Sequence, residues 1–236
     1  MVAALAAISV IGTASAATIY SDSLTGSDTA LEGTTADTSA AFAGGTASAT
    51  WTAAGSINET AGGAAVLNNT MAFLPITITT GYVYTLQATI TNVGAGWSAL
   101  GFSDDATTSG AWHTIGDKTA WALLQSENGD TSAPQFFGGP ATANPGAWSS
   151  TADGTQILTI TLDATNALWS TYATIDGVNS NTVTYAANPT ITHVGFGVQT
   201  ATSTVSNFSL SAVVPEPSTA LLGGIGLLAL LRRRRA

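Results

Sequence analysis

The groups that could do chemistry in this chain are carboxylates, two histidines and six tryptophans, because cysteine is absent. Glycoside hydrolysis needs a pair of carboxylates about 5–10 Å apart, and no strand-like run of the chain spaces its acids in that way. Glu32, Glu59 and Glu127 each stand alone in apparent loops. A Gly-x-Ser-x-Gly elbow for a nucleophilic serine is also missing from the sequence. The residues therefore favour a protein that is not an enzyme.

Two adjacent aspartates, Asp104 and Asp105, are the candidate metal ligands. They fall in a predicted loop, with Asp117 further along. Loop carboxylates and carbonyls suit Ca²⁺, although the chain has no spaced Asp-x-Asp-x-Asp-Gly loop. His113 and His193 lie far apart in the sequence, and without cysteine they do not suggest zinc. The sequence thus allows one calcium ion at this loop and implies no other cofactor.

The tryptophans are the candidate sugar contacts, because the apolar faces of a pyranose pack on large aromatic rings. Trp97, Trp121 and Trp169 fall in predicted strands and are expected in the core. Trp112 and Trp148 have loop-like surroundings, Ser-Gly-Ala-Trp-His and Pro-Gly-Ala-Trp-Ser. We therefore predict Trp112 and Trp148 as a glycan-binding platform.

The segment 17–214 is acidic. It holds thirteen of the fourteen Asp and Glu residues, and Lys118 is its single Lys or Arg, so its formal net charge is −12. Binding to DNA, RNA or anionic lipid needs basic groups. This composition excludes a nucleic-acid partner and suits a soluble extracellular protein. With no cysteine, disulfide bonds cannot stabilise the fold.

Apolar residues alternate with threonine along several runs of this segment. Tyr82, Tyr84, Leu86, Ala88 and Ile90 fall on one face of a run whose other face carries threonine and glutamine. This period of two indicates half-buried strands. The same pattern predicts about twelve or thirteen short strands, near 17–24, 46–53, 64–69, 72–79, 82–92, 97–103, 120–126, 134–138, 156–163, 168–176, 181–186, 191–199 and 204–213.

Hairpin-type dipeptides separate some of these runs: Asn128-Gly129, Asp153-Gly154 and Asp176-Gly177. The segments 25–45 and 104–118 are weakly patterned and are expected to be long loops. Many short strands without a helical stripe predict an all-β, two-sheet antiparallel sandwich of about 200 residues as one domain, 17–214.

Residues 1–16 form an apolar stretch that ends in Ala14-Ser15-Ala16, an A-x-A cleavage site. The basic residues that begin a signal peptide are missing. A start codon assigned too late explains this, and a hydrophobic strand is the alternative. We interpret 1–16 as a signal peptide that is truncated at its N-terminus.

The last residues, 215–236, combine three features in a fixed order. Val214, Pro215, Glu216 and Pro217 come first, an apolar run over 220–231 follows, and Arg232, Arg233, Arg234 and Arg235 close the chain. The prolines prevent a strand or helix from running through them. The apolar run would be a helix of roughly 18 Å, short for a hydrocarbon core of about 30 Å. Snorkelling arginine side chains would extend it and remain cytoplasmic.

This order resembles the PEP-CTERM sorting signal. The resemblance implies an exported protein that is held transiently in the inner membrane by its C-terminal hydrophobic helix. It also implies that an exosortase, a membrane-embedded enzyme, cuts near the Pro-Glu-Pro and releases the body to the cell envelope or an extracellular polysaccharide matrix. A plain C-terminal membrane anchor is the alternative.

A second resemblance covers most of the body. The strand order carried by 97–103, 121–124, 136–139, 157–163, 169–177, 194–197 and 205–210 is similar to the concanavalin A-like, or laminin-G-like, jelly roll. That resemblance implies that the first strand, Thr18-Ile19-Tyr20, pairs with the last. Because this fold hosts lectins, glycosidases, adhesion modules and spacers, it does not by itself define a function.

Three hypotheses follow from the sequence. The leading one is an exported surface or matrix protein that binds extracellular polysaccharide. The second is a structural matrix component without a ligand. The third is a glycan-degrading enzyme, which would need a cleft with paired carboxylates.

Overall fold

The computed structural model describes residues 15–66, 70–92, 96–109, 118–126, 134–138, 154–199 and 203–215. These residues form strands, turns and loops and contain no helix. None of them therefore belongs to a helix that could cross a membrane. The predicted C-terminal helix lies outside the described residues.

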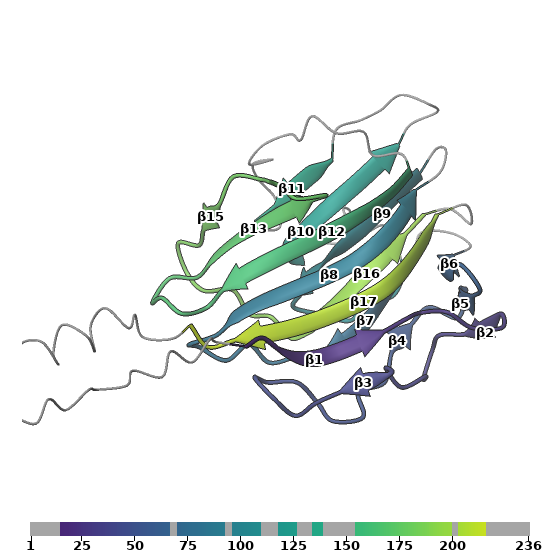
Figure 1. Cartoon of the computed structure of the whole chain (residues 1–236), viewed down its shortest axis with the longest axis horizontal. Helices are drawn as coiled ribbons and strands as arrows, with labels where there is room; N and C mark the ends of the chain where they lie inside the picture. The colour runs from purple at the N-terminus through teal and green to yellow at the C-terminus, as the bar shows by residue number, and fades with distance from the viewer. Residues whose placement is uncertain are drawn as a thin grey trace, which may run out of the picture.

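The strands form two sheets (Figure 1). The larger sheet has eleven strands: β1 (Ala17–Asp22), β2 (Thr29–Ala30), β3 (Thr38–Ser39), β5 (Ile57–Thr60), β6 (Gly63–Val66), β8 (Val83–Asn92), β12 (Gly154–Asp163), β13 (Ser170–Ile175), β14 (Val178–Asn179), β15 (Val183–Thr184) and β17 (Thr204–Val213). The smaller has six: β4 (Thr52–Ala53), β7 (Thr70–Pro75), β9 (Gly96–Ser103), β10 (Lys118–Ser126), β11 (Gln135–Phe137) and β16 (His193–Val198).

Strand order in the larger sheet is β14-β13-β12-β8-β17-β6-β5-β2, with β1 also paired to β17, and in the smaller sheet it is β11-β10-β9-β16-β7-β4. The ladders that build both sheets are antiparallel. The prediction of an all-β, two-sheet antiparallel sandwich is confirmed.

The first and last strands pair, as the jelly-roll resemblance implies. Thr18 lies opposite Ser211 and Tyr20 opposite Leu210. Pairing of β1 with β17 brings the two ends of the described chain to the same end of the sandwich, where Ala17 lies opposite Ala212 (Figure 1).

The main core lies between the two sheets and follows the alternation seen in the sequence. In β8, Tyr84, Leu86, Ala88 and Ile90 are fully buried, while the residues between them are half-buried or exposed. β12 and β17 repeat this pattern. Because these three strands are neighbours in one sheet, their inward side chains form a continuous apolar layer.

Some predicted strands are shorter than expected. Strand 72–79 ends at Pro75, because Ile76 N donates to Thr192 O and Thr77 N to Gly44 O, which takes the chain out of the sheet. Of 46–53, only Thr52–Ala53 form a strand, β4, and Thr50 makes an isolated bridge to Thr35. Four strands were not predicted: β2 and β3 within the expected loop 25–45, and β5 and β14. Each is four residues or fewer and carries no apolar alternation.

The two predicted loops have different outcomes. Segment 25–45 is a loop apart from the two-residue strands β2 and β3. Within 104–118, residues 110–117 lie outside the described part, and Lys118 already belongs to β10.

A second apolar cluster lies on the outer face of the smaller sheet. It consists of buried Met71, Phe73, Trp97, Ala99, Trp121 and Leu123, with Phe137 packed against it. The Trp121 and Phe137 rings stack with centroids 4.1 Å apart. β9 is therefore buried on both faces along its whole length. Trp97 and Trp121 are buried, as predicted, but on the face opposite the main core.

Glycine at two positions of this outer face lets the rings lie close to the sheet. A Cβ on Gly195 would lie 2.0 Å from the Ala72 carbonyl oxygen and 2.8 Å from the Phe73 ring. A Cβ on Gly101 would lie 2.4 Å from the Trp121 Cβ. The cluster thus requires the absence of a side chain at both glycines.

We expect Gly195→Ala to lower the free energy of unfolding by about 1–3 kcal/mol, because backbone must move to admit the methyl group. The matched control is Gly55→Ala, whose Cβ would meet no atom within 4 Å. That variant should be unchanged or more stable by about 0.4–1 kcal/mol. Urea unfolding of both variants measures the difference, and equal midpoints would contradict the packing described.

Candidate functional site

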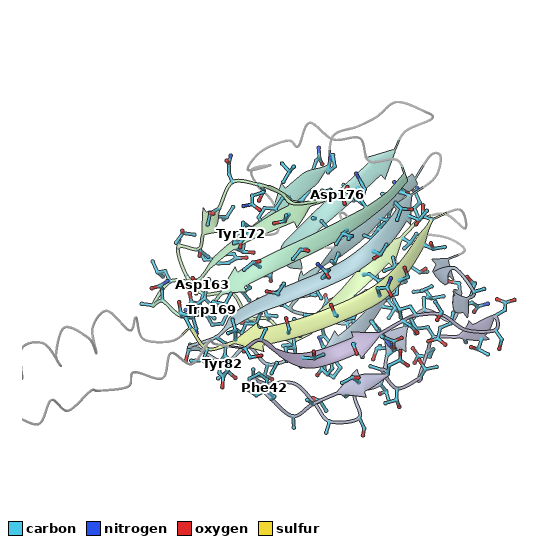
Figure 2. The ribbon with its side chains drawn as sticks, in the orientation of Figure 1. Phe42, Tyr82, Asp163, Trp169, Tyr172 and Asp176 are labelled. Carbon is cyan, nitrogen blue, oxygen red and sulfur yellow. The ribbon has the colours of Figure 1, made fainter. Side chains whose placement is uncertain are left out.

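The outer face of the larger sheet is covered by hydroxyl and amide side chains. Five neighbouring strands, β13, β12, β8, β17 and β1, each contribute two of them, and none of the ten is buried. We call these residues the hydroxyl face: Thr18, Ser21, Thr85, Gln87, Thr159, Thr161, Tyr172, Thr174, Ser209 and Ser211. Figure 1 shows four of these strands, β12, β8, β17 and β1, side by side, and Tyr172 is labelled in Figure 2.

The register of the ladders aligns these side chains in two rows across the sheet. One row runs from Tyr172 through Thr161, Thr85 and Ser211 to Thr18. The other runs from Thr174 through Thr159, Gln87 and Ser209 to Ser21. Neighbours within a row are about 4.8 Å apart, and the rows are separated by about 7 Å along the strands. The face is therefore a regular array of polar groups.

Polar side chains bond to one another across strands both within the hydroxyl face and beside it. Gln87 Nε2 donates to Thr159 Oγ1 at 3.0 Å, and the hydroxyls of Thr91 and Thr155 lie 2.9 Å apart. Hydroxyls and amides both donate and accept hydrogen bonds. The array can therefore exchange these contacts for bonds to water or to the hydroxyls of a ligand.

A hollow of about 350 Å³ opens on this face where β17 is irregular. It is lined by Ser21, Asp22, Ser23, Gln87, Asn207, Phe208 and Ser209. The register between β17 and β8 shifts between Ser206 and Ser209, and Asn207 takes a left-handed φ of 51°. A β-bulge of this kind redirects side chains and bends its strand. The bulge thus interrupts the pairing of β17 with β8 beside the end of β1, and the hollow opens there.

Asp22 lines the hollow but is itself almost fully buried. Its Oδ2 accepts a 2.7 Å bond from Trp51 Nε1, and its Oδ1 accepts a 2.8 Å bond from Leu24 N. Burial raises the pKa of this carboxyl, and the bonds from Trp51 and Leu24 oppose the shift. Because both oxygens serve protein donors, Asp22 fixes the turn after β1.

Glu59 does not stand alone as predicted; that expectation is wrong. β5 brings it beside the turn that holds Asp22 and Asp37, and Asp37 Oδ2 accepts a 2.9 Å bond from Ser23 N. Burial raises the pKa of Glu59, and the charges of Asp22 and Asp37 raise it further. The sequence could not indicate this group, because its members come from three separate segments.

The described part of the predicted calcium loop, residues 104–109, contains Asp104 and Asp105, and hydrogen bonds to protein groups hold it. Ser103 Oγ donates to the Asp105 carbonyl at 2.8 Å, and Asp105 Oδ1 accepts from Thr107 N at 3.0 Å. The Asp104 carbonyl accepts from Thr192 Oγ1 at 2.6 Å. Among the described residues, no group of three or more His, Cys, Asp or Glu could hold a metal ion. Calcium at Asp104 and Asp105 remains a prediction.

Most of the other predicted site residues lie in parts of the chain that the structure does not describe. Trp112 and Trp148 lie outside the described residues, as do His113, Glu216, Pro217 and Arg232–Arg235. Val214 and Pro215 follow β17 directly. His193 lies at the start of β16 with its ring edge-on to Phe73 and its Nδ1 2.8 Å from Thr192 Oγ1.

Comparison with known families identifies the C-terminal segment. The PEP-CTERM protein-sorting motif matches residues 213–235, which include the predicted Val-Pro-Glu-Pro and the four arginines. This motif indicates export and sorting to the envelope or the extracellular space, and it implies processing by an exosortase. The chain is thus an exported protein with a sorted β-sandwich body. None of the curated proteins matches its sequence.

Solved structures of concanavalin A-like and legume-lectin-like sandwiches are similar in fold. An endo-1,3-β-glucanase from Streptomyces sioyaensis has 12% identity and a TM-score of 0.49, over 85% of this chain and 97% of that chain. The carbohydrate-binding module CBM66 from Bacillus subtilis has 15% identity and a TM-score of 0.42, over 69% and 91%. The exoplasmic/lumenal domain of VIP36, in a Ca²⁺/Man2-bound form, has 10% identity and a TM-score of 0.44, over 70% and 81%. Identities this low transfer no site to this chain.

The pH dependence of stability tests the raised pKa values of Asp22 and Glu59 beside the hollow. Because the folded-state pKa of Asp22 and of Glu59 is raised, the native state binds protons more readily than the unfolded state between the two pKa values. The contribution of these groups to stability therefore falls as pH rises through their folded-state pKa values, and the urea midpoint should rise as the pH is lowered from neutrality toward the ordinary pKa range of carboxyl groups.

Two isosteric variants test whether the rise in the urea midpoint comes from these carboxyl groups. Asp22→Asn should reduce it, whereas Asp28→Asn, at an exposed position of the next loop, should keep it. An unchanged pH dependence in Asp22→Asn would show that this carboxyl titrates alike in both states.

Proposed function

We propose that the protein is an exported component of the cell envelope or matrix whose body binds extracellular polysaccharide. In this proposal residues 1–16 are the signal peptide, 17–214 the binding body and 215–236 the sorting segment. The observation that carries it is the hydroxyl face, two rows of polar side chains across five strands with a hollow at its bulge.

The chemistry of the face suits a neutral glycan. A polysaccharide presents hydroxyls at regular intervals, and hydroxyl and amide side chains can both donate to them and accept from them. The acidic body disfavours anionic polymers. An array of many weak contacts binds a long chain well, because each further contact is made by a ligand that is already held.

Trp112 and Trp148 belong to the same proposal as stacking residues, and the loop of Asp104 and Asp105 as a calcium site. Neither assignment depends on the hydroxyl face, so each is tested separately. Exosortase processing near Pro215 would free the body to reach the matrix. A structural matrix protein without a ligand is the outcome if no glycan binds.

The test is a glycan array and a polysaccharide pull-down with the purified protein, with and without Ca²⁺. Gln87→Ala removes an exposed amide from the centre of the hydroxyl face and should weaken binding about fivefold, the value of one net hydrogen bond. Asn181→Ala removes an exposed amide outside the face and should leave binding unchanged. Absence of binding to every glycan, including the native matrix, would refute the proposal.

Trp112→Ala and Trp148→Ala locate the site. Loss of binding in these variants, with Gln87→Ala unaffected, would move the site from the hydroxyl face to the tryptophan loops. Weaker binding in all three variants, Trp112→Ala, Trp148→Ala and Gln87→Ala, would indicate one continuous site. Binding that requires Ca²⁺ and is lost in Asp105→Asn would support the calcium site.

A further inference from the structure

Both ends of the described chain lie at one end of the sandwich, which we call the tail end. β1 begins there with Ala17, and β17 ends there with Val213 opposite Val83 of β8. The loops 40–46, 76–82 and 164–169 complete it, since Gly81 N donates to Ala164 O and Thr77 N to Gly44 O. Figure 2 shows Phe42, Tyr82, Asp163 and Trp169 gathered at this end and Asp176 far from it.

The tail end presents apolar and aromatic side chains. Leu168 is 48% exposed and Val214 51% exposed. Behind them, Phe42 and Tyr82 are partly buried, with ring centroids 5.5 Å apart in an edge-to-face contact. Among the described residues, Asp163 lies at this end, and its Oδ1 accepts from both the amide and the hydroxyl of Thr165. Asp104 lies at the same end on the smaller sheet, since its carbonyl accepts from Thr192, whose own carbonyl accepts from Ile76 N. The surface is thus apolar at its tip and polar at its sides.

The chain that follows fixes where this surface must lie. Four residues, 216–219, lie between Pro215 and Ala220, the start of the apolar run, and the five Cα-to-Cα steps span at most about 18 Å when extended. The headgroup layer beside a hydrocarbon core is itself about 5–8 Å thick. While the run lies in a bilayer, the tail end cannot move far from the headgroups. The run is also short for a span, which draws the body closer.

We propose that the tail end docks on the lipid surface while the C-terminal segment is inserted, with Leu168 and Val214 in the headgroup layer. The inference rests on the sorting part of the proposed function. Aromatic side chains such as Tyr82 are favourable at that depth. A small patch suffices, because the tether supplies a high local concentration of membrane. Cleavage near Pro215 then removes the tether, and the remaining contact is too weak to hold the body.

The absence of cysteine allows single labels to report membrane contact. The full chain is reconstituted in vesicles of zwitterionic phosphatidylcholine that contain lipids with nitroxide-labelled acyl chains. An environment-sensitive fluorophore is attached to Leu168→Cys at the tail end. The matched controls are Val178→Cys and Ile157→Cys, at positions 55% and 49% exposed but far from the tail end. Ala229→Cys reports insertion of the apolar run.

Strong quenching and a blue shift at position 168, with neither at 157 or 178, would support the docking. Quenching at 229 without quenching at 168 would overturn it and leave membrane anchoring intact. Absence of quenching at 229 would show that the apolar run is not inserted, and it would overturn the docking proposal as well. The glycan pull-down is independent of these labels, so failure of polysaccharide binding is recognised separately.

Discussion

The packing of Trp51 against both sheets is the interaction on which the rest of the structure depends. Its ring meets Phe196 of β16 and Phe208 of β17 edge to face, with centroids 5.5 and 5.0 Å apart. One side chain thus joins the smaller sheet to the larger one. Its Nε1 is buried and bonds to Asp22 Oδ2, which sets the turn after β1. The same residue therefore fixes the distance between the sheets and one wall of the hollow.

The long strands of the larger sheet could be predicted from the sequence because each is buried on one face only. β12 and β17 alternate apolar residues with threonine or serine, so their pattern reveals both the strand and the side that faces the core. The short strands could not be predicted in this way. β2, β3 and β14 have two residues each and owe their conformation to the neighbours that they pair with.

The candidate site could be predicted only in part. Threonine on the outer face of the strands follows from the alternation, but the rows across the sheet depend on register between strands far apart in sequence. The hollow depends on a single bulge at Asn207, a residue that the sequence marks only as part of an Asn-Phe-Ser triplet. The group of Asp22, Asp37 and Glu59 likewise appears only when β5 is placed beside the first turn.

The small fraction of charged residues raises the question of what keeps the sheets from pairing with other molecules. Charged residues are 8% of the chain, so repulsion by lysine or glutamate on edge strands is not its main protection. The edges are instead short: β14 and β2 close the order of the larger sheet with two residues each. β11 and β4 close the smaller sheet with three and two. A short edge offers few unpaired amides and carbonyls to another chain, so the uncharged hydroxyl face can stay exposed without the sheet edges joining copies together.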